Sequence, residues 1–279
     1  MPSSPGILTM DNEWKPMAEQ AVLSVLPPSS KLVSFGRHGS PNWASGYKVE
    51  VEHQCEKKAY YFKVIYHPCH PEIARGEYES QKALQEYLPN NVSIPAAYGT
   101  FKDGKTSFFL TPFRDLSLDV PSPPEFAEVV AKLHTTSVSP TGKFGFHITT
   151  YVGRVPVIND WCDTWEEWFT RDFREGLAFE RSVNGADLHF DELAAEFLKK
   201  VVPRLLRPLE TGGRSVKPKL LHGELWEVCV YGHNELDACL LSRRPGSQLD
   251  RDHLTAYKNL VPPSEPAEDY EDRLTLYLM

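Results

Sequence analysis

The fold of this protein is decided by the stretch LHGELWEVCVYGHNELD, residues 221–237. The stretch opens with a His-Gly-carboxylate run, HGELW at 222–226, and closes with a second polar cluster, YGHNE at 231–235. Only the four residues EVCV separate Trp226 from Tyr231. The question is whether this stretch is a complete phosphate-transfer centre or one that has lost its middle, and the answer depends on the rest of the chain.

The bulk composition is that of a soluble globular protein. The chain has 279 residues, of which 41% are hydrophobic and 24% are charged, and this length can bury a sizeable core. The formal net charge of −8 argues against a general nucleic-acid binder. No apolar run approaches a membrane span, and the N-terminus lacks the order of a secretory signal. The five scattered cysteines indicate thiols in a reducing, cytoplasmic compartment. The oligomeric state is left open.

The hydrophobic pattern predicts strands first and helices afterwards. Period-two alternation and β-branched or aromatic residues indicate strands, and apolar residues at helical spacing indicate helices. Pro203 is expected to kink the last helix or to begin a new one. The predicted strands are 47–53, 58–67 and 107–113, with a turn in CEKK (55–58); the predicted helices are 72–88, 124–136, 161–174 and 191–206, with a Pro-rich link at 117–125.

A lysine on a strand precedes a glutamate on a helix. Lys63 lies in YYFKVIY and Glu77 in ARGEYES. A strand lysine held by a helix glutamate can reach the α- and β-phosphates of ATP in kinase-fold phosphotransferases. The alternative is a solvated lysine and an unrelated helix-face glutamate. Upstream, FGRHGSPNW (35–43) could fold over phosphates or could be an ordinary turn, because it lacks the complete glycine-rich patterns.

Three tryptophans fall on one face of a predicted helix. Trp161, Trp165 and Trp168 are spaced i, i+4 and i+7. Core packing is the favoured interpretation and a platform for substrate is the alternative. His134, at the end of another apolar helical stripe, is interpreted as structural.

In combination, these motifs resemble a known family. HGELW and YGHNE resemble stretches of the fructosamine kinase and protein-ribulosamine 3-kinase family, relatives of the aminoglycoside phosphotransferases. The resemblance covers roughly residues 30–277 and keeps the order of the motifs. Its other segments are FLTPF (109–113), AKLHTTSVSPTGKFGFHITTYVGRVP (131–156), WCDTWEEWF (161–169) and SEPAEDYEDRLTLY (264–277).

The resemblance implies an α+β, two-lobed protein-kinase-like fold, similar to that of the aminoglycoside phosphotransferases. It implies an N-terminal extension at 1–30 and a β-rich, nucleotide-binding N-lobe at 31–116. A helical C-lobe at 117–279 would carry catalysis and substrate binding, and the chain stops where the family continues into further helical structure.

The resemblance also implies an activity. Members of the family use ATP and Mg²⁺ to phosphorylate a sugar hydroxyl of ribulosamines or fructosamines, on glycated proteins or on small ketoamines. The phosphorylated adduct then leaves, which deglycates the protein. Two alternatives remain open: a non-catalytic, pseudokinase-like binding module, and a small-molecule phosphotransferase of the aminoglycoside or choline type.

Roles for individual residues follow from the resemblance. Lys63 would orient the phosphates and Glu77 would hold Lys63. The carboxylate of Glu224 would accept or orient the proton of the substrate hydroxyl. The remaining candidates are the hinge residues Thr111, Pro112 and Phe113, with backbone groups for adenine, and His222 and Trp226 as substrate contacts.

The chain departs from the family pattern at the metal. Glu224 stands where the family has aspartate, and a displacement of about 1 Å can cost on the order of 10²-fold in rate. The family's metal-binding asparagine falls at Cys229, and a thiol is a poor ligand for Mg²⁺. Four residues cannot form the hairpin that precedes the family's metal-binding aspartate, and Asp237 lies past its place. No metal ligand is therefore identified, and loss of the hairpin is expected to impair activity.

Overall fold

The computed structural model describes residues 7–39, 44–102, 104–117, 119–153, 155–223, 229–243 and 249–279. The chain divides into two compact units. Unit 1 comprises residues 1–82 and 93–117, and unit 2 comprises residues 83–92 and 118–279.

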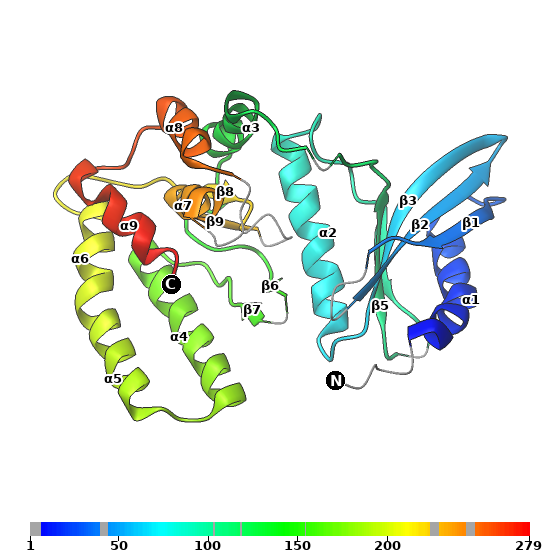
Figure 1. Cartoon of the computed structure of the whole chain (residues 1–279), viewed down its shortest axis with the longest axis horizontal. Coiled ribbons are helices and arrows are strands. Elements are labelled where there is room, and N and C mark those ends of the chain that lie inside the picture. Colours follow the sequence, from blue (N-terminus) through cyan, green and yellow to red (C-terminus); the bar gives the residue numbers. More distant parts are fainter. Residues whose placement is uncertain are drawn as a thin grey trace. The chain divides into compact units, whose positions relative to one another are not determined.

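Unit 1 is built on an antiparallel sheet with the strand order β1-β2-β3-β5-β4 (Figure 1). The sheet carries a helix on each face. Its elements are α1 (Ile7–Val25), β1 (Lys31–Arg37), β2 (Ala44–His53), β3 (Glu56–Ile65), α2 (His70–Tyr87), β4 (Ala97–Thr100) and β5 (Ser107–Pro112). The three predicted strands and the first predicted helix are confirmed, with ends that differ by up to three residues.

The hairpin between β2 and β3 turns at two residues, Gln54 and Cys55. His53 pairs with Glu56, and the two turn residues have φ values of 51° and 65°. Positive φ at both central positions gives a backbone twist that matches the flanking strands. The predicted turn at 55–58 was therefore wrong in position, since β3 already begins at Glu56.

Alternation along the strands sends two sets of side chains to opposite faces of the sheet. One face holds Val49 and Phe62, which pack with Ala18 and Val22 of α1 in an apolar core. The predicted N-terminal extension (1–30) therefore contains a helix, α1, that packs on the sheet. The other face carries Lys63, whose ammonium group bonds to Glu77 of α2.

Unit 2 is mostly helical. Helix α6 begins at Val202 directly after a short π-helix, and Pro203 lies in its first turn. The backbone at Val201 and Val202 is helical, so the irregularity predicted at Pro203 is a change from π-helix to α-helix one residue before the proline, and no separate helix begins there. The elements are α3 (Pro123–Thr136), β6 (Thr150–Val152), β7 (Val155–Val157), α4 (Trp165–Asn184), α5 (Leu188–Glu196), the π-helix (Phe197–Val201), α6 (Val202–Leu206), a 3₁₀ turn (Arg207–Glu210), β8 (Lys219–Leu221), β9 (Val230–Gly232), α7 (Glu235–Arg243), α8 (Arg251–Leu260), a 3₁₀ turn (Ala267–Asp269) and α9 (Tyr270–Leu276).

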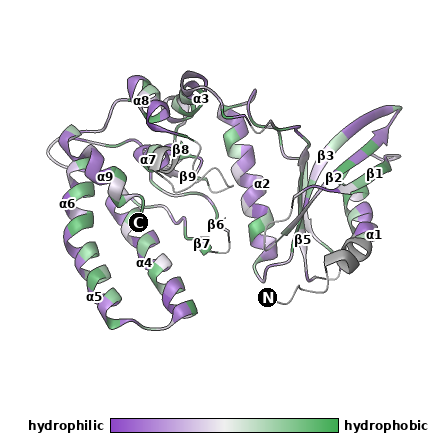
Figure 2. Ribbon diagram, viewed as in Figure 1, coloured by the Kyte–Doolittle hydropathy of each residue, from purple (hydrophilic) through white to green (hydrophobic). Residues whose placement is uncertain are grey.

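The core of unit 2 forms around α4. Trp165 and Trp168 are buried and stack with ring centroids 4.9 Å apart. Trp165 also donates its indole N–H to the Tyr277 hydroxyl at 2.7 Å. The core interpretation of these two tryptophans is confirmed. Polar and apolar residues alternate along α4, α5 and α6 (Figure 2), and no helix in the described part of the chain is both long and apolar enough to span a bilayer.

A buried histidine makes the stability of unit 2 depend on pH. His233 is fully buried between the Tyr277 hydroxyl at 2.7 Å and the Ser264 hydroxyl at 2.9 Å. Burial lowers the pKa of His233 from 6.5 to about 4. Between pH 4 and pH 6.5 the unfolded chain binds a proton at His233 that the folded chain does not bind. The contribution of His233 to the free energy of unfolding is therefore fully present above pH 6.5 and decreases as the pH falls below it.

We expect the His233 contribution to fall by about 2 kcal/mol from pH 7 to pH 5. Urea unfolding of the unsubstituted chain and of His233→Gln, which cannot titrate, measures the difference. The His233→Gln chain should lose less stability over this window. Equal pH slopes for the two chains would contradict the assignment.

Candidate functional site

Lys63 and Glu77 meet inside unit 1. Lys63 on β3 is 6% exposed and Glu77 on α2 is 5% exposed, and the Lys63 Nζ lies 2.6 Å from a carboxylate oxygen of Glu77. Burial keeps such a pair from being screened by solvent, in contrast to surface ion pairs. The solvated alternative for both residues is thereby excluded, and the lysine is fixed in one orientation.

The predicted hinge residues follow β5. The Thr111 hydroxyl accepts a hydrogen bond from Gln81 Nε2 at 2.6 Å. The Phe113 N–H already donates to the Ala59 carbonyl at 2.9 Å, and Pro112 has no N–H. Because hydrogen-bonded pairs recur at every second residue of an antiparallel ladder, the Thr111 N–H lies in the ladder too. A ligand at this strand therefore finds no available N–H donor at 111–113.

The stretch that contains the predicted catalytic carboxylate connects two short strands of unit 2. Strand β8 ends at Leu221 and β9 begins at Val230, and these two residues pair directly. The connection is thus the eight residues 222–229. Glu224 and Trp226, predicted as catalytic and substrate-binding residues, lie outside the described residues.

The start of this connection is held by Asp237 of α7. Its carboxylate accepts hydrogen bonds from the backbone N–H of His222 at 2.7 Å and of Gly223 at 2.9 Å. The two N–H groups thus bind different oxygens of one carboxylate, and Gly223 has a positive φ of 55°, which glycine adopts without strain. The predicted substrate contact of the His222 side chain stays a prediction.

A buried chain of polar groups supports Asp237 from behind. His134 Nε2 lies 3.1 Å from Asp237, and His134 Nδ1 lies 2.7 Å from the Tyr257 hydroxyl. Because the Asp237 carboxylate only accepts, His134 Nε2 carries a proton and donates to it. In the neutral imidazole Nδ1 then accepts from the Tyr257 hydroxyl, which in turn accepts from Asn234 Nδ2 at 2.9 Å. The structural interpretation of His134 is confirmed.

The charge of Asp237 is stabilised by these donors. Burial alone raises the pKa of Asp237, but hydrogen bonds from His134 and from the His222 backbone outweigh it and hold the pKa below its ordinary value. Sequence reasoning assigned no role to this residue. The available signal was a carboxylate inside the apolar run LDACLL (236–241), because a charge in a buried segment requires buried partners.

Cys229 lies in an apolar cluster rather than in a polar site. Its side chain is fully buried with Leu84, Leu220 and Tyr231. No group of three or more histidine, cysteine, aspartate or glutamate side chains in the described residues could hold a metal ion. The donors among the described residues therefore do not fit a Mg²⁺ site at the end of this connection.

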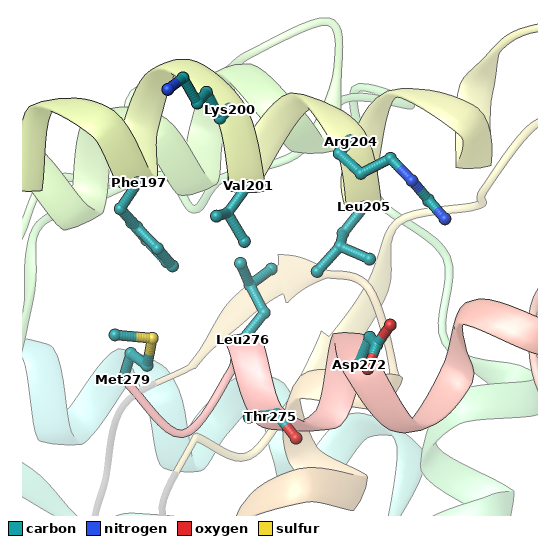
Figure 3. A pocket seen from close by; sticks show the side chains of 9 residues that line it. All are labelled: Phe197, Lys200, Val201, Arg204, Leu205, Asp272, Thr275, Leu276 and Met279. Atoms are coloured by element: carbon teal, nitrogen blue, oxygen red, sulfur yellow. The ribbon is translucent and has the colours of Figure 1, made fainter. Parts of the chain in front are cut away.

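Unit 2 also has a hollow of about 360 Å³ between the π-helix and α6 on one side and α9 on the other (Figure 3). Its lining is apolar at Phe197, Val201, Leu205, Leu276 and Met279, and polar at Lys200, Arg204, Asp272 and Thr275. Arg204 is paired with Asp269, and none of the residues predicted for the site lines this hollow.

Solved structures with similar folds define the class. The chain aligns with a putative fructosamine-3-kinase from Haemophilus somnus 129PT at a TM-score of 0.72, with 19% identity over 95% of this chain and 87% of the other. A putative fructosamine-3-kinase from Thermobifida fusca YX-ER1 aligns at 0.69, with 20% identity over 92% and 88%. The predicted α+β, protein-kinase-like fold is confirmed.

The sequence comparisons then give the family. The sequence profile described as fructosamine kinase matches residues 44–279, and the chain belongs to this family, which is a family of kinases. A probable ketoamine kinase of Enterococcus faecium is 23% identical over 274 residues, 92% of this chain and 89% of the other.

Other relatives match over shorter segments. The chloroplastic protein-ribulosamine 3-kinase of Oryza sativa subsp. indica is 26% identical over 60% of this chain, and the ketosamine-3-kinase of Mus musculus is 27% identical over 48%. The aligned segments span about half the length of the rice and mouse proteins.

Proposed function

We propose that this protein phosphorylates a sugar hydroxyl of ketoamines, with ATP as the donor. The substrates are ribulosamines or fructosamines, on glycated proteins or on small amines, and release of the phosphorylated adduct deglycates the protein. The observation that carries the proposal is the buried contact between Lys63 and Glu77, which supplies a fixed cation for a phosphate group. None of the five cysteines, all in the described part, forms a disulfide, which supports a reducing cytoplasm as the compartment.

The proposal gives roles to Lys63, Glu77, Asp237 and Glu224. Lys63 binds the phosphates and Glu77 keeps its ammonium group in place, because phosphoryl transfer depends on positioning and electrostatic stabilisation. Asp237 fixes the backbone at His222 and Gly223. Glu224 would accept or orient the proton of the substrate hydroxyl.

The described residues provide no set of ligands for the magnesium ion that the resemblance implies. Kinases of this fold class use a divalent ion to neutralise charge on the phosphates. The described donors do not fit such an ion, since the thiol at Cys229 is enclosed by apolar side chains. We assign no step to a metal, and we expect a lower rate than in a chain with the complete hairpin.

A second candidate follows from the same observation. A chain that keeps its phosphate-binding lysine but lacks metal ligands would bind nucleotide without transferring phosphate. Such a protein would act as a binding module for nucleotide or for ketoamines. No described residue favours the aminoglycoside or choline type of phosphotransferase.

One experiment separates the two candidates. The chain is incubated with ATP, Mg²⁺ and a ribulosamine of a small amine, and ³¹P NMR follows the formation of a sugar phosphate. Product formation that disappears in Lys63→Met supports the kinase. Thermal melting with ATP, with and without Mg²⁺, tests binding, because a ligand of the native state raises the melting temperature. A metal-independent shift without product would contradict the kinase and support the binding module.

A further inference from the structure

We infer that His70 and Gln81, which lie on either side of Glu77 in α2, are positioning residues that fix this helix on β5 so that Glu77 holds Lys63. The inference rests on the proposed nucleotide function and adds to it the residues that set the place of the Lys63 ammonium group. Neither His70 nor Gln81 touches the nucleotide in this assignment, because each acts through Glu77.

Gln81 bonds the later part of α2 to the sheet. Its amide nitrogen Nε2 donates to the Thr111 hydroxyl on β5 at 2.6 Å and to the Ser93 carbonyl at 2.8 Å. Gln81 follows Glu77 by four residues, about one helical turn, so the two side chains lie on the same side of α2. The turn of α2 next to Glu77 is thereby attached to β5 and to the segment before β4.

His70 bonds the start of α2 to the same strand. His70 is buried, and its Nδ1 lies 2.8 Å from the hydroxyl oxygen of Ser107, which is fully buried. The Ser107 oxygen lies in turn 2.9 Å from the hydroxyl oxygen of Thr100 on β4. Glu77 follows His70 by seven residues, about two helical turns, so His70 and Glu77 also share one side of the helix.

The strand register places these two attachments on either side of Lys63. Lys63 of β3 pairs with Phe109, which is two residues after Ser107 and two before Thr111. Side chains two residues apart on a strand point to one face, and so do those of directly paired residues on neighbouring strands. Lys63 and the two bonded hydroxyl groups of β5 therefore lie on the same face of the sheet.

The lengths of the two elements agree with this arrangement. The strand rises about 14 Å from Ser107 to Thr111, and the helix rises about 16 Å from His70 to Gln81. Helix α2 therefore runs along β5, with Glu77 between its two points of attachment and within reach of Lys63.

Few apolar contacts hold this part of α2. The apolar clusters of the described residues include members of α2 at 83, 84 and 87, but none at 70–82. Between the two attachments the buried side chains are those of Ile73, Ala74, Glu77 and Ser80, of which only Ile73 is a large apolar one. Apolar burial is also non-directional. The hydrogen bonds at the two attachments therefore decide where Glu77 lies along the strand.

The first test removes one attachment and keeps the volume of the side chain. Gln81→Met should weaken ATP binding roughly 2- to 10-fold, the net effect of one hydrogen bond, and isothermal calorimetry measures the affinity. His70→Phe, which keeps a ring but cannot bond to Ser107, should act in the same direction. In a Glu77→Gln chain, where Lys63 has lost its anionic partner, neither change should weaken ATP binding further, because coupled residues are not additive.

Gln85→Met is the matched control. It makes the same change one turn further along α2, at a side chain that has no hydrogen-bond partner among the described residues. ATP affinity should stay the same in this chain.

A second measurement follows Lys63 without any ligand. NMR of the chain labelled with [¹³C]lysine gives the Lys63 signal, which is assigned by its absence in Lys63→Met, and Glu77→Gln gives its position when the pair is broken. Gln81→Met and His70→Phe should move the Lys63 signal toward that position, and Gln85→Met should not.

Two results would overturn the positioning role and leave the proposed function standing. One is an ATP affinity that Gln81→Met leaves unchanged, or weakens equally with and without Glu77. The other is a Lys63 signal that stays in place in both Gln81→Met and His70→Phe. If the unsubstituted chain did not bind ATP, the proposed function would fall, and the Lys63 signal would then decide the positioning role by itself.

Discussion

Asp237→Ala is expected to lower the free energy of unfolding by about 3–5 kcal/mol, the range for breaking a buried charged network. The change removes the acceptor of three buried donors: the backbone N–H groups of His222 and Gly223 and the imidazole of His134. Each donor left without a partner costs about 1–3 kcal/mol. Urea unfolding measures the loss.

Asp237→Asn removes the charge and keeps the shape of the side chain. Because the amide keeps one acceptor oxygen, the free energy of unfolding of Asp237→Asn should lie between those of the unsubstituted chain and Asp237→Ala. The N–H groups of His222 and Gly223 should also exchange with deuterium faster in Asp237→Asn, since local opening there is easier. Asp163→Ala, which removes an exposed carboxylate paired with Lys143, serves as control and should leave stability nearly unchanged. Asp237→Ala as stable as that control would contradict the anchoring role.

Arg273→Met is the second large effect, and we expect a loss of about 3–5 kcal/mol. Arg273 is fully buried and binds Glu235 through two nitrogens, at 2.7 and 3.0 Å. The same guanidinium donates to the carbonyls of Ser264 at 2.7 Å and Pro266 at 2.8 Å. Methionine fills the space but leaves the Glu235 charge and both carbonyls without this donor, and thermal and urea unfolding report the loss.

The control for Arg273→Met is Arg207→Met, at another arginine that makes two hydrogen bonds to one carboxylate. Arg207 binds Glu166 at 2.7 and 3.0 Å, but its side chain is 61% exposed. Arg207→Met should change stability little, because water replaces the lost bonds. Part of the Arg273→Met loss should return in Arg273→Met/Glu235→Leu, which removes the stranded charge. If Arg273→Met and Arg207→Met lost equal stability, burial would not be the source of the effect.

Local sequence pattern predicted the elements whose causes are local. Period-two alternation located β2, runs of apolar, aromatic and β-branched residues located β3 and β5, and the apolar stripe located α3. Pro203 indicated an irregularity in the helix after 191, and α6 begins one residue before it. The turn at Gln54 and Cys55 was predicted at the wrong position, because neither residue type indicates the positive φ that it adopts here.

The candidate site was predictable only in part. The types of Lys63 and Glu77 suggested a pair, but their contact depends on how α2 packs on the sheet. The direct pairing of Leu221 with Val230 likewise needed the tertiary structure, although the short spacer between Trp226 and Tyr231 had pointed to a shortened centre. Asp237 was missed because its partners are 14, 15 and 103 residues away along the chain.

The sequence by itself determined the family, the order of a β-rich half before a helical half, and the spacer of only four residues between HGELW and YGHNE, since these are properties of residue type and spacing. Only the tertiary structure decided that Cys229 is enclosed by apolar side chains, that Asp237 anchors the backbone at His222 and Gly223, and that Gln81 bonds to Thr111. Each of these is a contact between segments distant in sequence. The energy of such a contact depends on burial and on the direction of its hydrogen bonds, which no local pattern records.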